Sequence, residues 1–135
     1  MDNSKIKELI ESAEKARLKA YAPYSDFTVG AALLCDDGSI YNGVNIENAS
    51  YPVGICAERA AFSAAVSDGK KSFSAIALVG GHSGCNADKP CFPCGICRQF
   101  MSELCGGGFF VISAANTENY SLQTLSELLP FAFEL

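Results

Sequence analysis

Apolar residues near the N-terminus recur at the three- and four-residue spacing of one helix face, with lysine and glutamate on the opposite face. The apolar positions are Ile6, Leu9, Ile10, Ala13, Ala16 and Ala20. Asn3 or Ser4 can cap the start of this helix, because their short side chains accept hydrogen bonds from free backbone N–H groups. Pro23 is expected to end it, since the residue before a proline avoids the helical region.

The pattern then changes to one that is typical of β-strands. Residues 27–35 and 39–46 contain most of the β-branched and aromatic side chains of this part of the chain. Between them lies the turn sequence Asp36-Asp37-Gly38. The two runs therefore predict a β-hairpin.

Helical spacing returns at residues 57–66, where alanines lie on one side, and Gly69 suits the position just after the helix end. The continuous apolar run at 74–80 is typical of a strand that is buried on both faces. Residues 80–93 are rich in glycine, asparagine, proline and cysteine, which predicts a loop.

The last third of the chain repeats this alternation. A short helix is expected at 95–104 and a second buried strand at 109–115. Thr124 and Glu127 have the spacing of a capping box, which opens a final helix that Pro130 ends. Strands that alternate with helices after the hairpin predict an α/β fold, with one sheet covered by helices on both faces.

Length and charge exclude several classes of protein. The 135 residues show no repeat and no linker, so a single domain spanning 1–135 is expected. The net charge is −5 and the ten lysines and arginines are scattered, whereas nucleic-acid binding needs a basic face. No apolar run approaches the ~18 residues of a membrane helix, and residues 1–15 are too polar for a signal-peptide core. We therefore expect a cytoplasmic protein with no nucleic-acid or membrane partner.

Seven cysteines are the unusual feature of the composition. Without an export signal, clustered cysteines indicate a metal or catalysis more often than disulfides. Two short stretches are informative: Cys56-Ala57-Glu58-Arg59, and Pro93-Cys94-Gly95-Ile96-Cys97-Arg98-Gln99. Both lie at an expected helix start, where free N–H groups stabilise thiolates.

Three thiolates from these stretches would leave the fourth position of a tetrahedral zinc open for water, which is the arrangement of a catalytic zinc site. Glu58 lies two residues beyond Cys56, so its carboxylate could move a proton of that water. A different class of protein also fits part of the pattern. Cys85, Cys91, Cys94 and Cys97 fall within thirteen residues and could form a closed four-cysteine zinc or iron–sulfur site without catalysis.

The sequence resembles the small, homotetrameric class of cytidine deaminases. The resemblance covers nearly the whole chain and is carried by the segments YAPYSDFTVGAALL (21–34), GVNIENASYP (43–52), GICAERAAF (54–62), PCGICRQ (93–99) and ELLPFAF (127–133). The paired motifs of the two cysteine stretches are the signature of zinc nucleobase deaminases. The resemblance implies a mixed five-stranded sheet and one Zn²⁺ per chain. It also implies hydrolytic deamination of cytidine and 2′-deoxycytidine to uridine and 2′-deoxyuridine, a reaction of pyrimidine salvage.

The resemblance also implies a role for individual residues. The zinc ligands would be Cys56, Cys94 and Cys97, and Glu58 would be the general acid and base. The substrate-binding residues would be Asn45 and Glu47 at the ribose hydroxyls, Phe27 beside the pyrimidine, backbone groups of Ala57 at the base, and Phe133 in the site of a neighbouring subunit. Arg59 would lie near the thiolates and offset their charge. An alternative within this class is deamination of another aminopyrimidine nucleoside.

Two of these roles also agree with the residues alone. The Glu47 carboxylate and the Asn45 amide are two residues apart on an extended segment and point to the same side, as two sugar hydroxyls would require.

The only histidine, His82, lies in a loop of glycine and serine and is expected at the surface rather than at a metal.

Overall fold

Five strands form one mixed sheet in the computed structural model, which describes residues 1–135. The strands are β1 (Phe27–Cys35), β2 (Ile40–Val44), β3 (Phe73–His82), β4 (Phe110–Ala114) and β5 (Tyr120–Thr124). Their order across the sheet is β2-β1-β3-β4-β5. Only β3 and β4 are parallel, and every other neighbouring pair is antiparallel. The predicted hairpin is confirmed, since Leu34 pairs with Ile40 across the turn.

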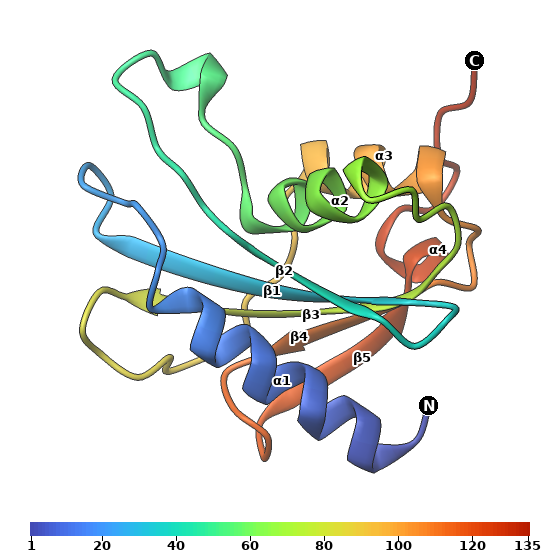
Figure 1. Ribbon diagram of the computed structural model, residues 1–135, viewed down its shortest axis with the longest axis horizontal. Helices are drawn as coiled ribbons and strands as arrows, with labels where there is room; N and C mark the ends of the chain where they lie inside the picture. The colour runs from blue at the N-terminus through green and yellow to red at the C-terminus, as the bar shows by residue number, and fades with distance from the viewer.

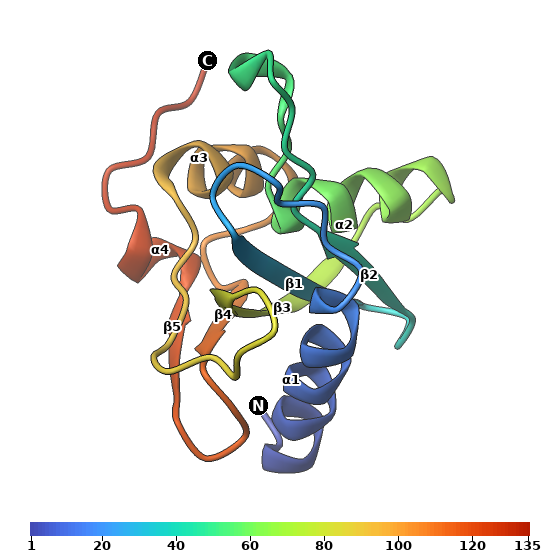
Figure 2. The ribbon, with the colours of Figure 1, turned by 90° about the vertical axis from the view of Figure 1, so that its left-hand side faces the viewer.

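Helices cover both faces of this sheet, as Figures 1 and 2 show. Helix α1 (Asn3–Arg17) lies on one face, and α2 (Ala57–Ser67) and α3 (Gly95–Leu104) lie on the other. A short helix α4 (Leu125–Leu128) follows β5, and Tyr51–Val53 form one 3₁₀ turn. The expected three-layer α/β arrangement is therefore confirmed. No helix combines the length and the apolar composition needed to cross a membrane.

Strand β1 shows why both faces are covered. Successive side chains of a strand point to opposite faces. Ala31 and Leu33 pack into the core below α2 and α3, whereas Ala32 and Leu34 pack into the core below α1. All four are apolar, so each face of β1 excludes water only when a helix covers it.

The start of helix α2 lies directly against the backbone of β2, and this contact fixes the position of the cysteine that precedes the helix. A Cβ atom on Gly43 of β2 would come within 2.3 Å of the Ala57 carbonyl oxygen and the Ala61 nitrogen. Only glycine permits this contact between backbones. A side chain at position 43 would push the start of α2 away from the sheet.

The structure corrects both predicted ends of the first helix. Asp2, rather than Asn3 or Ser4, is the N-cap, because its side chain accepts the Ser4 N–H at 3.2 Å. The helix ends at Arg17, well before Pro23. Tyr21 instead pairs with residues 45–47, donating its N–H to the Asn45 carbonyl at 3.0 Å. This pairing satisfies backbone groups that another helical turn would have used.

Strand β5 was not visible in the hydrophobic pattern, which predicted only four strands. Its sequence Tyr-Ser-Leu-Gln-Thr is largely polar, and Leu122 is 38% exposed. The strand exists because its backbone pairs with β4 at the sheet edge, from Phe110 with Thr124 to Ala114 with Tyr120. An edge strand with one solvent-exposed face buries little apolar side-chain area, so the hydrophobic pattern of the sequence does not reveal it.

Candidate metal centre and substrate cavity

Two helix starts bring three cysteines together. Cys56 is the N-cap of α2 and Cys94 is the N-cap of α3, while Cys97 lies in the first turn of α3. Neither cap sulfur accepts a capping hydrogen bond from the backbone N–H groups of its own helix, so both can bind a metal ion. Arg98 holds the residue before Cys94, donating from Nε to the Pro93 carbonyl at 2.8 Å.

The three sulfur atoms fit one tetrahedral metal ion. They all lie within 4.8 Å of one another, and those of Cys56 and Cys94 are 3.9 Å apart. Two thiolates on a tetrahedral zinc, with Zn–S near 2.3 Å, are expected about 3.8 Å apart. Three soft sulfur ligands leave the fourth position open, as in a catalytic rather than a structural zinc site.

The surroundings of the cluster favour negative charge on the Cys56 sulfur. The hydrogen bond from Cys97, helped by Arg59 and Cys94, lowers the pKa of Cys56 to about 5, and the same bond raises the pKa of Cys97. Arg59 donates from Nη2 to the Cys56 sulfur at 3.6 Å, and its buried Nε has no partner. The guanidinium thus lies where three thiolates would otherwise concentrate negative charge.

Glu58 lies in the first turn of α2 and is only 4% exposed. Burial raises the pKa of its carboxyl, and the negative charge of Cys56 adds to this shift. A carboxyl group with a raised pKa holds a proton more readily than a free one, which suits a group that must both accept and donate protons.

A cavity of about 670 Å³ opens beside the cysteines. It is lined by the sequence-predicted residues Phe27, Asn45, Glu47, Cys56, Ala57, Glu58, Arg59 and Cys94. Ile46 bridges to Ile55 in both directions, with N–H···O distances of 3.0 Å, and this pairing brings the segment of Asn45 and Glu47 beside Cys56. Such an arrangement, an apolar cavity with a few polar groups beside a metal centre, can bind a small polar aromatic molecule.

The chain matches the family model of the cytidine and deoxycytidylate deaminase zinc-binding region over residues 3–113. This chain belongs to that family. A cytidine deaminase of Sporosarcina psychrophila is 48% identical over 128 residues, covering 95% of this chain and 90% of the relative. The solved cytidine deaminase of Burkholderia pseudomallei has a TM-score of 0.84 and 45% identity, covering 93% of this chain and 97% of that one. That of Mycobacterium tuberculosis has a TM-score of 0.80 and 40% identity, with 95% and 96% covered.

Family membership confirms the resemblance, the fold and the enzyme class inferred from the sequence. Zinc is the metal of the family, and the three clustered cysteines could bind it. The four-cysteine alternative is not formed, because neither Cys85 nor Cys91 joins the cluster. Cys85 is exposed in the loop after β3, and Cys91 lines the cavity as a partly buried thiol, whose pKa burial raises to about 11.

Phe133 is the one sequence-predicted substrate-binding residue that the structure places outside the cavity. Its side chain is 68% exposed, and its carbonyl accepts a hydrogen bond from Gln99 at 3.2 Å. In Figure 1 the C-terminal segment lies on the opposite side of the molecule from the loop between β2 and α2. Within one chain, therefore, Phe133 does not reach the substrate cavity.

Sequence reasoning missed two residues that support this site. Ser25 lines the cavity and bonds Glu47, and a hydroxyl two residues before Phe27 is a typical turn signal that could have indicated it. Arg17 is 9% exposed and donates to the Thr28 carbonyl at 3.0 Å and the His82 carbonyl at 2.7 Å, which ties α1 to the ends of β1 and β3. His82 is exposed, as expected, but is the last residue of β3, and its ring meets Phe27 edge-on at 5.9 Å.

Proposed function

We propose that this chain is a single catalytic domain that hydrolyses cytidine and 2′-deoxycytidine to uridine and 2′-deoxyuridine, with release of ammonia. The observation that carries the proposal is the buried Glu58 carboxyl beside three clustered thiols, at a cavity lined by Phe27. This reaction suits pyrimidine salvage in the cytoplasm. Another aminopyrimidine nucleoside is the alternative substrate, and turnover across a nucleoside panel distinguishes the two.

Each residue has a defined task in this reaction. Cys56, Cys94 and Cys97 would hold the zinc, which when bound supplies a water of lowered pKa as the nucleophile at C4 of the pyrimidine. Glu58 accepts one proton of the attacking water and delivers it to N3, and it then takes the second proton from the new hydroxyl on C4 and delivers it to the departing amine. Water thereby adds its oxygen to C4 as the C4–N bond breaks, which yields uridine and ammonia.

The remaining residues bind and orient the nucleoside. The Phe27 ring lies beside the pyrimidine, and backbone groups of Ala57 contact its polar edge. The side chains of Asn45 and Glu47 accept and donate hydrogen bonds at the ribose hydroxyls. Arg59 neutralises part of the charge of the thiolates, so that the metal they hold remains an electron-pair acceptor.

The charges of the cavity favour a nucleoside over a nucleotide. Arg59 is the only basic residue among those that line it, and its Nη2 is engaged with the Cys56 sulfur. Glu47 and Glu58 add negative charge to the same cavity. A 5′-phosphate would meet no free cation there, whereas an uncharged sugar meets no repulsion.

We further propose a homotetramer in which each site receives Phe133 from a neighbour. The side chains of Phe131, Phe133 and Leu135 are largely exposed in the single chain, and three exposed apolar residues at alternate positions indicate an interaction surface. Burying them between subunits would stabilise the assembly by ~25 cal/mol per Å² of apolar area. Sedimentation tests this directly, because a fully active monomer would contradict shared sites.

The decisive experiment for the activity itself is spectroscopic. Loss of the cytidine absorbance band on incubation with the purified protein, and its suppression by a strong chelator, is the expected result. Metal analysis should give one colourless zinc per chain. A protein that carries zinc but leaves the cytidine band unchanged would contradict the proposed function.

A further inference from the structure

We propose that Ser25 is a positioning residue whose single hydroxyl fixes both the carboxylate of Glu47 and the backbone of Phe27. The inference rests on the proposed function, in which Glu47 contacts the sugar and Phe27 the base. Ser25 would thereby couple the two halves of nucleoside recognition.

Glu47 is held entirely by two consecutive residues. Its Oε1 accepts the backbone N–H groups of Tyr24 and Ser25, each at 3.0 Å, and its Oε2 accepts the Ser25 hydroxyl. Neither oxygen forms an ion pair. Hydrogen bonds from Ser25, above all that of its hydroxyl, lower the pKa of Glu47, so the group is an ionised acceptor near neutral pH.

A carboxylate has about four acceptor sites, of which these contacts use three. The oriented group that remains can only accept, so it would bind a donor such as a sugar hydroxyl and repel an anion. Without the Ser25 hydroxyl, Oε2 would have no partner from the protein, and the carboxylate could rotate away from the position that a bound sugar needs.

The same hydroxyl reaches the residue that bears the aromatic ring. Ser25 Oγ accepts the Phe27 N–H at 3.0 Å. Between them, Asp26 has a φ of 58°, a left-handed conformation that is uncommon outside glycine. Such a conformation persists only where surrounding contacts hold it. The Ser25 hydroxyl is one of those contacts.

Asn45 holds Phe27 from the other side. Its Nδ2 donates to the Phe27 carbonyl at 2.9 Å, and its Oδ1 accepts the Val29 N–H at 2.8 Å. The N–H and the carbonyl of Phe27 are therefore both bonded to side chains, and both side chains line the cavity. Displacing one of these contacts should disturb sugar and base binding together.

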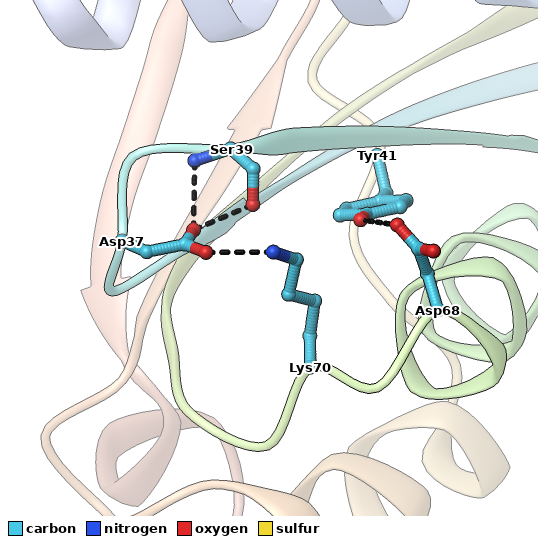
Figure 3. Close-up of polar contacts among 5 residues, drawn as sticks. All are labelled: Asp37, Ser39, Tyr41, Asp68 and Lys70. Carbon is cyan, nitrogen blue, oxygen red and sulfur yellow. Dashed lines mark hydrogen bonds and ion pairs between the residues drawn. The ribbon is translucent and has the colours of Figure 1, made fainter.

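A matched control exists at the far end of β1. Ser39 donates its hydroxyl to Asp37 at 2.6 Å and its N–H to the same carboxylate at 3.0 Å, as Figure 3 shows. This serine–carboxylate pair lies outside the cavity, in the hairpin turn. Ser39→Ala therefore removes similar hydrogen bonding without touching the proposed site.

The test compares two substrates on each purified, zinc-loaded variant. Cytidine carries both sugar hydroxyls and 2′,3′-dideoxycytidine carries neither, and the ratio of their kcat/KM values does not depend on how much enzyme is folded. In Ser25→Ala this ratio should fall by about tenfold, because a hydrogen bond to a charged group is lost. The kcat/KM for 2′,3′-dideoxycytidine should also fall severalfold, because the Phe27 backbone is released. Ser25→Thr, which keeps the hydroxyl, should restore both values, and Ser39→Ala should leave both unchanged.

An unchanged ratio in Ser25→Ala, or an unchanged kcat/KM for 2′,3′-dideoxycytidine, would overturn the coupling by Ser25. An equal effect of Ser39→Ala would do so as well, since it would show that the effect does not require a serine that lines the cavity. A wild-type protein that does not deaminate cytidine would instead overturn the proposed function, and this inference with it.

Discussion

Strand β1 joins two serine–carboxylate pairs that differ in what surrounds them. Before its first residue, Ser25 bonds Glu47 at the edge of the cavity. After its last residue, Ser39 bonds Asp37 in the hairpin turn. There Lys70 also donates to Asp37 at 2.7 Å, and Tyr41 donates its hydroxyl to Asp68 nearby, as Figure 3 shows.

The difference lies in the cation. Lys70 neutralises Asp37, and its hydrogen bond is the main reason that the pKa of Asp37 lies well below its usual 3.8. Glu47 has no such partner, so its charge stays available to a ligand. Near the same cavity, Glu58 is buried and the Nε of Arg59 is unpaired. Polar groups at the hairpin end of β1 therefore contribute to stability. Those at its other end, the cavity end, keep charges and hydrogen-bonding groups available to a ligand.

Removing a metal-binding thiol should have the largest effect at the cavity end. Cys56→Ala should abolish both zinc binding and turnover, because two sulfurs alone do not make the three-ligand site. Metal analysis and the cytidine assay measure the two losses. Cys85→Ala and Cys91→Ala are the controls and should keep one zinc and most of the activity. The closed four-cysteine site would be the better interpretation if Cys56 proved dispensable and Cys91 essential.

Glu58→Gln should come next, with turnover reduced by about 10²–10⁴-fold. Glutamine preserves the size of the side chain, so zinc content and fold should be retained while no group is left to move the proton. Steady-state kinetics beside metal analysis separates these quantities. Turnover within a few fold of wild type would remove Glu58 from the mechanism.

Phe133→Ala should have a smaller effect, confined to binding. KM for cytidine should rise by about tenfold with zinc intact, because a large apolar contact to the substrate is lost. Mixing Phe133→Ala with Glu58→Gln subunits after dissociation should regenerate some sites that hold both Glu58 and a neighbour's Phe133. Recovery of turnover in the mixture measures this. Unchanged kinetics of Phe133→Ala alone would show that one chain supplies every residue of the substrate site.

Lys70→Met should have the smallest effect, and only on stability. Breaking an exposed ion pair should lower the melting temperature slightly and leave kcat and KM unchanged. Because the folded state lowers the pKa of Asp37, this stabilisation is present above the ordinary value of 3.8 and is lost as pH falls below it. Melting curves at about pH 7 and about pH 3 should thus show a difference between wild type and variant that shrinks with acidification. A loss of activity in Lys70→Met would contradict the separation of the two ends.

Several features of this molecule could be predicted from the sequence because they depend on local spacing. The hairpin around Gly38 followed from two runs of strand-forming residues on either side of a turn sequence. The grouping of Cys56, Cys94 and Cys97 followed from two motifs that each start a helix. Each of these signals is carried by residues close in the chain and is visible without the fold, whereas the meeting of Cys56 with Cys94, 38 residues away, depends on the fold.

Other features depend on residues far apart in the sequence, and only the tertiary structure decided them. Strand β5 forms through its backbone pairing with β4 rather than through apolar side chains. The early end of α1 follows from the pairing of Tyr21 with the segment around Ile46. Ser25 and Glu47 are twenty-two residues apart, and nothing in either local pattern indicates that they bond.

By itself, then, the sequence determined which chemical groups the site contains, because the types and spacing of cysteine and glutamate specify three thiols that could bind a metal and one carboxyl group beside them. The tertiary structure decided how these groups are placed and oriented. Lys70 neutralises Asp37, whereas Glu47 lies beside the cavity without a cation, and Asn45 holds the backbone of Phe27 there. The reason is physical. Ligand identity is a property of single residues, whereas orientation requires hydrogen bonds between segments that only the folded sheet brings together.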